Sequence, residues 1–208
     1  MAAEADTEKR GRGTAWKLLV TALVLGLIGV VAGLGTWSAF SSTTSNSGNS
    51  FTAGTVSISD DDAGSAMFSL TGLKPGDSAS KCIVVTYTGS LPATVRLYGT
   101  TAGTGLDQYL DLTVTRGTIS SANFPSCGNF SADSTDYIGA GAGVVFNGTL
   151  QGYADDYASA LVDPTSGSPR TWTTNEAHSY RFQVTVEDQS GAQGKSATQT
   201  FTWEARNT

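Results

Sequence analysis

The chain has 208 residues, of which 39% are hydrophobic and only 14% are charged, and its formal net charge is −6 at pH 7. This length suits one domain of ordinary size together with a targeting segment. An acidic surface repels phosphate backbones, so the charge balance argues against a nucleic-acid partner and against adsorption to anionic lipid.

The first feature along the chain is a leader-like segment. Residues 18–34 contain no charged side chain, and several Lys and Arg residues precede them. A basic region followed by an apolar region is typical of a secretory signal peptide. The run is close to the shortest length that spans a bilayer, so an uncleaved anchor is the alternative. The small residues Thr36 and Ser38 favour cleavage before Ala39, and the sequence therefore predicts a signal peptide over 1–38.

The residues after the leader divide into an arm and a domain. Residues 39–50 are rich in Ser, Thr and Asn, and we expect them to form a flexible N-terminal arm. The remainder, 51–208, alternates apolar and polar residues in many places, which predicts β-strands with one buried face. Short strands are expected at 55–59, 66–70, 82–88, 93–98, 109–115, 180–187 and 201–206.

The last two of these strands show the pattern most clearly. In 180–187 the even-numbered residues are large and apolar, and in 201–206 the odd-numbered residues are apolar. Turn-forming residues separate the two runs, so the strands form either a long hairpin or consecutive strands of a sandwich. Residues 116–146 and 163–176 are rich in Gly, Ser and Thr and are expected to be long surface connections.

One segment, 147–162, has apolar residues at three- and four-residue intervals and is predicted to be a short helix. About eight short strands, one helix and no alternation of strands with helices favour an all-β fold. We expect an antiparallel jelly-roll β-sandwich with one short helix. Such a sandwich has edge strands, whose unpaired backbone groups must be covered or used.

The chain contains two cysteines, Cys82 and Cys127. In an exported protein an even pair most simply forms one disulfide. It would close a loop of about 45 residues and contribute on the order of 3–4 kcal/mol to stability. The alternative, a catalytic or metal-bound thiol, requires nearby histidines, and the chain has only His178. We therefore predict a disulfide.

Catalytic chemistry is weakly represented in the sequence. Zinc hydrolases use about three protein ligands, commonly from a His-Glu-x-x-His helix, whereas here one Glu176-Ala177-His178 run stands at the start of a predicted strand. No Gly-x-Ser-x-Gly nucleophile motif is present. We expect no catalytic residue, no metal site and no cofactor.

Two further patterns allow alternative interpretations. The run Asp60-Asp61-Asp62 is either a calcium-binding loop or a solvated turn between strands. The aromatic residues Trp172, Tyr137 and Tyr153 either form a sugar-binding platform, as in jelly-roll lectins, or pack in the core and loops. A cell-surface glycan-binding or adhesive module is therefore an alternative function.

Several motifs in order resemble the TasA/camelysin-like family of bacterial exported proteins. They are GTWSAFSS at 35–42, NSFTAGTVSIS at 49–59, LKPGDS at 73–78, TGSLPATVRL at 88–97 and QGKSATQTFTWEA at 193–205. The resemblance implies a jelly roll that is assembled into extracellular fibres of the biofilm matrix. It also implies removal of the leader by a dedicated signal peptidase, with Thr36, Trp37, Ser38, Ala39 and Phe40 as the processing site.

The resemblance also gives the arm a role. In the family, the freed N-terminal segment of one subunit completes the sheet of the next, which implies a donor strand that includes Ala39, Phe40, Thr43 and Thr44. A disordered tail is the alternative, because the residues up to Ser50 are poor strand formers. We expect the secreted chain to pair with itself, with the signal peptidase and possible matrix or cell-wall components as other partners. Some relatives are classed as metallopeptidases, which is the least favoured function.

Overall fold

The structure is a computed structural model that describes residues 41–45, 56–164 and 171–207. The chain divides into two compact units, Met1–Ala39 and Phe40–Thr208. The predicted signal peptide and the processing residues Thr36, Trp37, Ser38, Ala39 and Phe40 lie outside the described residues, as does most of the arm. The fold below is that of the second unit.

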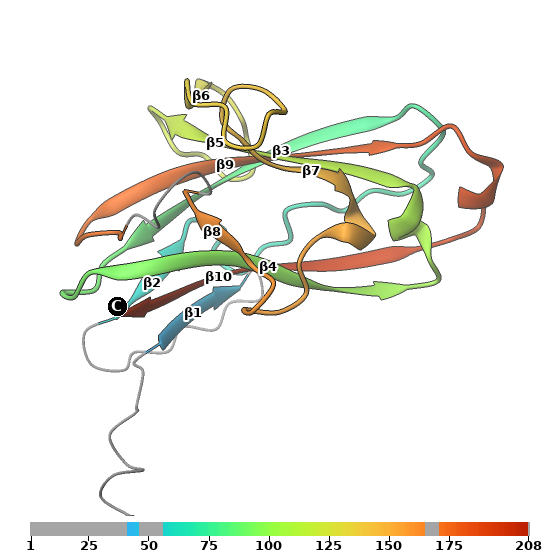
Figure 1. Ribbon diagram of the computed structural model, residues 1–208. Helices are drawn as coiled ribbons and strands as arrows, with labels where there is room; N and C mark the ends of the chain where they lie inside the picture. The colour runs from blue at the N-terminus through green and yellow to red at the C-terminus, as the bar shows by residue number, and fades with distance from the viewer. Residues whose placement is uncertain (1–40, 46–55, 165–170, 208) are drawn as a thin grey trace, which may run out of the picture. The chain divides into compact units, whose positions relative to one another are not determined.

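Two antiparallel sheets face each other in this unit (Figure 1). The first sheet has the order β1-β10-β4-β8, with bounds Ser41–Ser45, Ala197–Asn207, Ala93–Gly103 and Leu161–Asp163. The second has the order β2-β3-β9-β5-β6, with bounds Ile58–Asp60, Ser78–Tyr87, Glu176–Val186, Leu110–Ile119 and Phe130–Ala132. Strand β7 (Val144–Thr149) also pairs with β5.

The strand order confirms the predicted all-β sandwich. Consecutive long strands lie in different sheets, because the chain passes from β3 to β4, then to β5, and later from β9 to β10. One layer reads β1-β10-β4-β8 and the other contains β3-β9-β5-β7, which is the order of a jelly roll. Of the two arrangements open for the last two strands, consecutive sandwich strands is the correct one.

The predicted helix over 147–162 is wrong. This stretch contains the end of β7, the short 3-10 turn η2 (Leu150–Gly152) and a loop that leads to β8. Its apolar residues contact different neighbours instead of one helical face. Leu150 and Tyr153 enter the core, whereas the ring of Tyr157 lies under the guanidinium of Arg206. Two other 3-10 turns, η1 (Leu106–Tyr109) and η3 (Ser190–Ala192), connect strands.

Other boundaries also differ from the predictions. Residues 66–70 form no strand, although Met67 is buried, because this segment lines an apolar cavity instead of pairing. The connection expected over 116–146 contains the end of β5, all of β6 and the start of β7. In the connection expected over 163–176, Trp172 makes an isolated antiparallel bridge to Ala93.

Aromatic side chains join the two sheets in the core. Phe182 of β9 lies with its ring centroid 4.3 Å from that of Phe201 and 5.9 Å from that of Trp203, both of β10. Tyr180 of β9 also approaches Trp203, at 5.6 Å. The predicted alternation is seen in the burial of 180–186 on β9, whereas on β10 residues 201–205 are all buried, including Thr202 and Glu204, which were expected to face solvent. Aromatic contact across the layers fixes how the two sheets face each other.

The substitution Phe182→Ala tests this contact. We expect it to lower the free energy of unfolding by about 3–5 kcal/mol, because a cavity replaces an aromatic ring between the sheets. Gln183→Ala, at the exposed neighbouring position of the same strand, is the control and should change stability by less than about 0.5 kcal/mol. Urea unfolding measures both values, and equal effects of the two substitutions would contradict the packing described.

Candidate functional site

The first candidate site is the edge of the first sheet. Strand β10 pairs with β4 along its whole length, from Ala197 to Asn207. On its other side, β10 pairs with β1 only from Thr202 to Arg206. Within the described residues, the part of β10 from Ala197 to Phe201 therefore has no strand partner on the β1 side.

The structure places part of the predicted donor strand at this edge. In the antiparallel register, Thr43 is opposite Glu204 and Thr44 is opposite Trp203. Ala39 and Phe40, the other two predicted donor residues, lie outside the described residues. The segment around Thr43 and Thr44 is thus a strand in the structure, held by main-chain pairing at a sheet edge.

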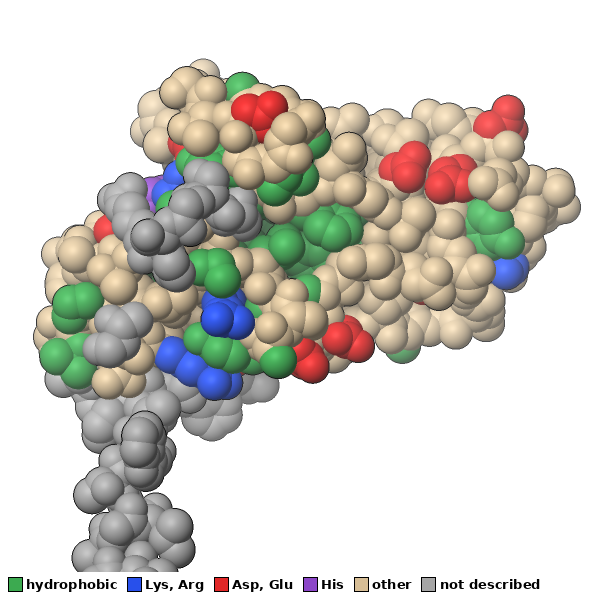
Figure 2. Space-filling view, in the orientation of Figure 1, with side chains coloured by type: hydrophobic (Ala, Val, Ile, Leu, Met, Phe, Trp, Pro, Cys, Tyr) green, Lys and Arg blue, Asp and Glu red, His purple; other side chains and the backbone are tan. Residues whose placement is uncertain are grey.

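An apolar cavity lies beside the start of β10. Its volume is about 340 Å³, and the lining includes Met67, Phe68, Leu73, Leu106 and Phe201. Elsewhere, on the face drawn in Figure 2, most of the surface is neither charged nor hydrophobic, in keeping with the low charged fraction of the sequence. The part of β10 with which β1 does not pair, Ala197–Phe201, thus also lines an apolar cavity.

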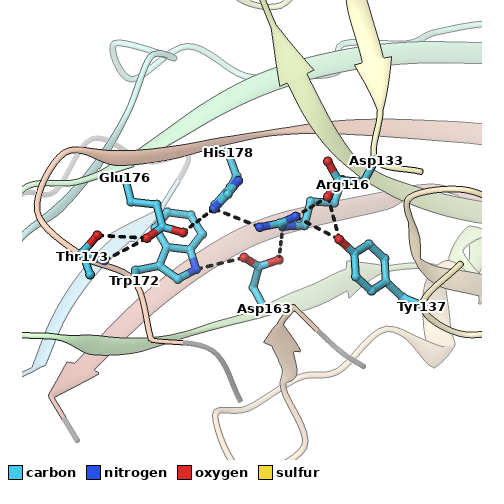
Figure 3. Close-up of polar contacts among 8 residues, drawn as sticks. All are labelled: Arg116, Asp133, Tyr137, Asp163, Trp172, Thr173, Glu176 and His178. Carbon is cyan, nitrogen blue, oxygen red and sulfur yellow. Dashed lines mark hydrogen bonds and ion pairs between the residues drawn. The ribbon is translucent and has the colours of Figure 1, made fainter. Parts of the chain in front are cut away.

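The second candidate site is a buried polar cluster between the sheets (Figure 3). Arg116 of β5 and Asp163 of β8 are 4% and 1% exposed, and the Arg116 Nε lies 2.8 Å from Asp163 Oδ1. The indole Nε1 of Trp172 donates a hydrogen bond of 2.9 Å to Asp163 Oδ2. Because β5 and β8 belong to different sheets, this ion pair ties the two layers together.

The guanidinium of Arg116 has further partners on its own side. It pairs with Asp133, and its Nη1 donates a hydrogen bond of 3.0 Å to the hydroxyl of Tyr137. The Tyr137 hydroxyl in turn donates to Asp133 at 2.7 Å. Burial is the largest single effect and lowers the pKa of Arg116, but the electrostatic effects of Asp163, Tyr180, Asp133 and Tyr137 together outweigh it, so the pKa is raised.

The histidine of the chain, His178, belongs to the same cluster. Its Nε2 is 2.9 Å from Nη2 of Arg116 and 2.9 Å from Oε1 of Glu176. A cation bound at this nitrogen would stand beside a guanidinium, which would repel it. The residues present therefore do not fit a zinc site of the peptidase kind. Over the described ranges, moreover, no three His, Cys, Asp or Glu side chains are grouped so that they could hold a metal ion.

The acidic run forms turn and edge contacts. The Asp62 carboxylate accepts a hydrogen bond of 2.6 Å from the Gly64 N–H. The Asp61 carboxylate accepts one of 2.8 Å from the Val84 N–H on β3. The run thus forms the end of β2 and the turn after it, and Asp62 is buried rather than solvated.

Of the two interpretations of Trp172, Tyr137 and Tyr153, packing in the core and loops is the correct one. Trp172 is fully buried and Tyr153 is 5% exposed, so neither presents a ring face to a sugar. Tyr137 is partly buried and packs against the core, with its hydroxyl in the polar cluster. The aromatic residues thus serve packing and hydrogen bonding, and the hypothesis of a glycan-binding module loses its structural basis.

The predicted disulfide is confirmed. Cys82 of β3 is bonded to Cys127, which lies in the loop between β5 and β6, and their Cα atoms are 5.1 Å apart. The bond joins residues 45 positions apart in the sequence. It attaches a long loop to a strand of the second sheet.

The substitution Asp163→Ala tests the buried pair. We expect it to lower the free energy of unfolding by about 3–5 kcal/mol, because it leaves the Arg116 guanidinium buried without its main counterion. The double variant Arg116→Met/Asp163→Leu removes both charges and should be more stable than Asp163→Ala alone. Guanidinium chloride unfolding measures the stability of both variants. A double variant less stable than Asp163→Ala would disprove the role given to the unpaired Arg116 charge.

The Asp62 carboxyl should make stability depend on pH. Burial raises its pKa from 3.8 to about 6, Asp60 adds to this, and the hydrogen bond from Gly64 opposes it. The folded state thus binds the proton more tightly than the unfolded state, and this contribution to stability is present below about pH 4 and lost as pH rises through 6. Asp62→Asn should therefore stabilise the protein at pH 7 and have little effect at pH 4.

Unfolding free energies measured from pH 4 to pH 7 check this prediction. Asp62→Ala is the matched control, because it also removes the acceptor for the Gly64 N–H and should be less stable than Asp62→Asn at every pH. A constant difference between Asp62→Asn and the unchanged chain across this pH range would refute the assignment.

The comparisons with known proteins follow from this description. No helix in the part of the chain that the structure describes is long and apolar enough to cross a membrane. No curated protein sequence matches the chain. Residues 14–104 match the family model described as camelysin metallo-endopeptidase. This segment includes four of the five motifs on which the resemblance was based, so over these residues the chain is similar to the camelysin family.

Proposed function

We propose that this protein is a secreted structural subunit that assembles into extracellular fibres of the biofilm matrix. Each subunit donates its N-terminal arm, residues 39–50, to the β10 edge of the next. The match of residues 14–104 to the camelysin family model supports the coarse assignment. The single observation on which the mechanism rests is the pairing of β1 with β10 at the edge of the first sheet.

Strand β1 is well placed for exchange between copies. Among the described residues, it is the first strand of the domain and lies at the end of its sheet, where its neighbour is β10. An identical strand from another copy can replace it in the same register without disturbing any interior pair. The donated Thr43 then lies opposite Glu204 and the donated Thr44 opposite Trp203, as they do within one chain.

The length of the arm suits the length of the edge. When the β1–β10 register is continued, donated residues 46–50 fall opposite Ala197–Phe201. This is the part of β10 that has no strand partner on that side within the described residues. A donated arm that stays extended beyond Ser45 would thus pair with the main-chain groups of Ala197–Phe201 as well as with those of Thr202–Arg206.

Head-to-tail donation leads directly to a filament. The arm and the β10 edge are different surfaces, so their contact is heterologous, and such contacts give open assemblies unless a rotation closes a ring. Removal of the leader by a signal peptidase between Ser38 and Ala39 would free the arm for this contact, at the cell surface or in the matrix. The contact uses main-chain groups and needs no cofactor, and we propose no enzymatic activity for this chain.

Proline substitution in β1 tests the donor-strand mechanism. Thr43→Pro/Thr44→Pro removes the N–H groups of two successive residues, and one of the two must face β10 because successive N–H groups point to opposite sides of a strand. We expect the variant to remain monomeric at concentrations at which the unchanged secreted chain forms filaments. Electron microscopy and light scattering over a concentration series measure the difference.

The matched control is Thr43→Val/Thr44→Val, which keeps both N–H groups and a β-branched shape and should still assemble. N-terminal sequencing of the secreted material locates the cleavage site in the same samples. The donor-strand mechanism is wrong if the proline variant forms filaments as readily as the valine variant, or if the secreted chain stays monomeric at high concentration.

A further inference from the structure

The outer edge of β3 is the other long edge of the sandwich. Strand β3 has ten residues, and β9 pairs with all of them on the inner side. On the outer side, β2 pairs only with Val85, Thr86 and Tyr87. A long edge without cover is a template for pairing with another chain, so the remainder of this edge matters for assembly.

The donors on this outer edge have partners that are not strands. The N–H groups of Cys82 and Val84 point away from β9, because both are bonded on the other side. Cys82 N–H donates to the carbonyl oxygen of Pro125 at 3.1 Å, and Val84 N–H donates to Asp61 Oδ1 at 2.8 Å. A loop carbonyl and a side-chain carboxylate thus occupy the positions that a neighbouring strand would take.

The disulfide fixes the loop that provides this cover. Cys127 lies two residues after Pro125 in the loop. The loop therefore contacts Cys82 twice, through the disulfide from Cys127 and through the hydrogen bond that the Pro125 carbonyl accepts from the Cys82 N–H. Within the loop, the Ser126 N–H donates to the Asn123 carbonyl at 2.7 Å, which closes a turn around Pro125. The covalent bond therefore keeps residues 123–127 against the middle of the β3 edge.

Short strands limit the other edges in a different way. Strand β8, at the far side of the first sheet, has three residues, and β6, at the far side of the second sheet, also has three. Neither offers a long run of main-chain groups for pairing. The six residues of β7 outside β5 and the part of β4 beyond its pairs with β8 are further edges, and among the edges that the structure describes β3 is the one whose cover is held by a disulfide.

We propose that the Cys82–Cys127 disulfide guards the β3 edge, so that this edge takes no part in strand pairing between copies. Without the bond, the loop at 123–127 leaves the edge and β3 accepts a strand from a second copy of this chain. Assembly then has two acceptor edges per subunit, which gives branched or lateral aggregates in place of single filaments. This inference rests on the fibre role proposed above, because it assigns the second edge a part in the same assembly.

The test uses the full secreted chain with its arm blocked by Thr43→Pro/Thr44→Pro. In this background, Cys82→Ser/Cys127→Ser should convert the monomer into larger species, measured by sedimentation velocity. Leu112→Ala is the matched control, because it destabilises the buried centre of β5 without touching the β3 edge. The comparison requires that Leu112→Ala and the cysteine-free variant have lost a similar amount of thermal stability. Under that condition Leu112→Ala should stay monomeric.

Hydrogen exchange identifies the edge that pairs. The amide of residue 82 should exchange faster in the cysteine-free monomer than in the disulfide-bonded chain, and should become protected again in the larger species. A cysteine-free variant that stays monomeric, or that associates no more than Leu112→Ala does, would overturn the proposal. So would larger species in which the residue 82 amide remains unprotected.

The two proposals fail in different experiments. The fibre role is decided with the disulfide intact, by comparing the unchanged arm with the proline arm. The guarding role is decided within the proline background, by comparing the cysteine-free chain with Leu112→Ala. If the proline background itself assembles, the fibre mechanism is wrong, and the residue 82 amide still shows whether loss of the disulfide opens the β3 edge.

Discussion

A β-sandwich must satisfy the main-chain donors and acceptors on its outermost strands, and this requirement organises the molecule. Interior strands meet it through their neighbours, as β9 does between β3 and β5. At the margins the chain uses other means: strands of three residues at β6 and β8, a carboxylate and a loop carbonyl along β3, and a strand from the start of the domain along β10. Only the last of these is a removable piece of regular strand.

Contacts in the interior of the sandwich fix the positions of these edge strands. Aromatic rings of β9 and β10 meet between the layers, and the Arg116–Asp163 pair links β5 to the short strand β8. A buried ion pair is weak evidence of stability by itself, because desolvation offsets much of its attraction. Here it has a positional effect, since it links a strand of only three residues, at the far side of the first sheet, to β5 of the second sheet.

Period-two patterning was sufficient to predict the layers, because strands with one buried face alternate by geometry. It also contained a signal that was missed: the inward positions Leu110, Leu112 and Val114 continue to Arg116, which is buried at the next such position. A charged residue in phase with a core face indicates a buried partner, but its partner Asp163 is not identifiable from spacing. The helix expected at 147–162 failed because three- and four-residue spacing also arises when successive apolar residues of an irregular segment contact different neighbours.

The candidate site was predictable in part. The disulfide follows from the cysteine count, whereas the donor role of the arm stays a prediction from the family motifs. The choice of edge was not predictable, because strand order depends on contacts between residues far apart in the chain, such as Ser41 with Arg206. The role of Asp61 was hidden for the same reason, since its partner Val84 lies 23 residues away.

The main-chain pairing of β1 with β10 bears on how freely the sequence of the arm can vary. Main-chain pairing recognises an extended backbone and is nearly indifferent to which side chains it bears, apart from the exclusion of proline. Arms of divergent sequence can therefore fit one and the same acceptor, provided that they stay extended over about five residues, the mean length of a natural strand. Under the assembly proposed above, related chains secreted together would copolymerise into mixed filaments whose surfaces vary along the filament while the joints between subunits stay alike.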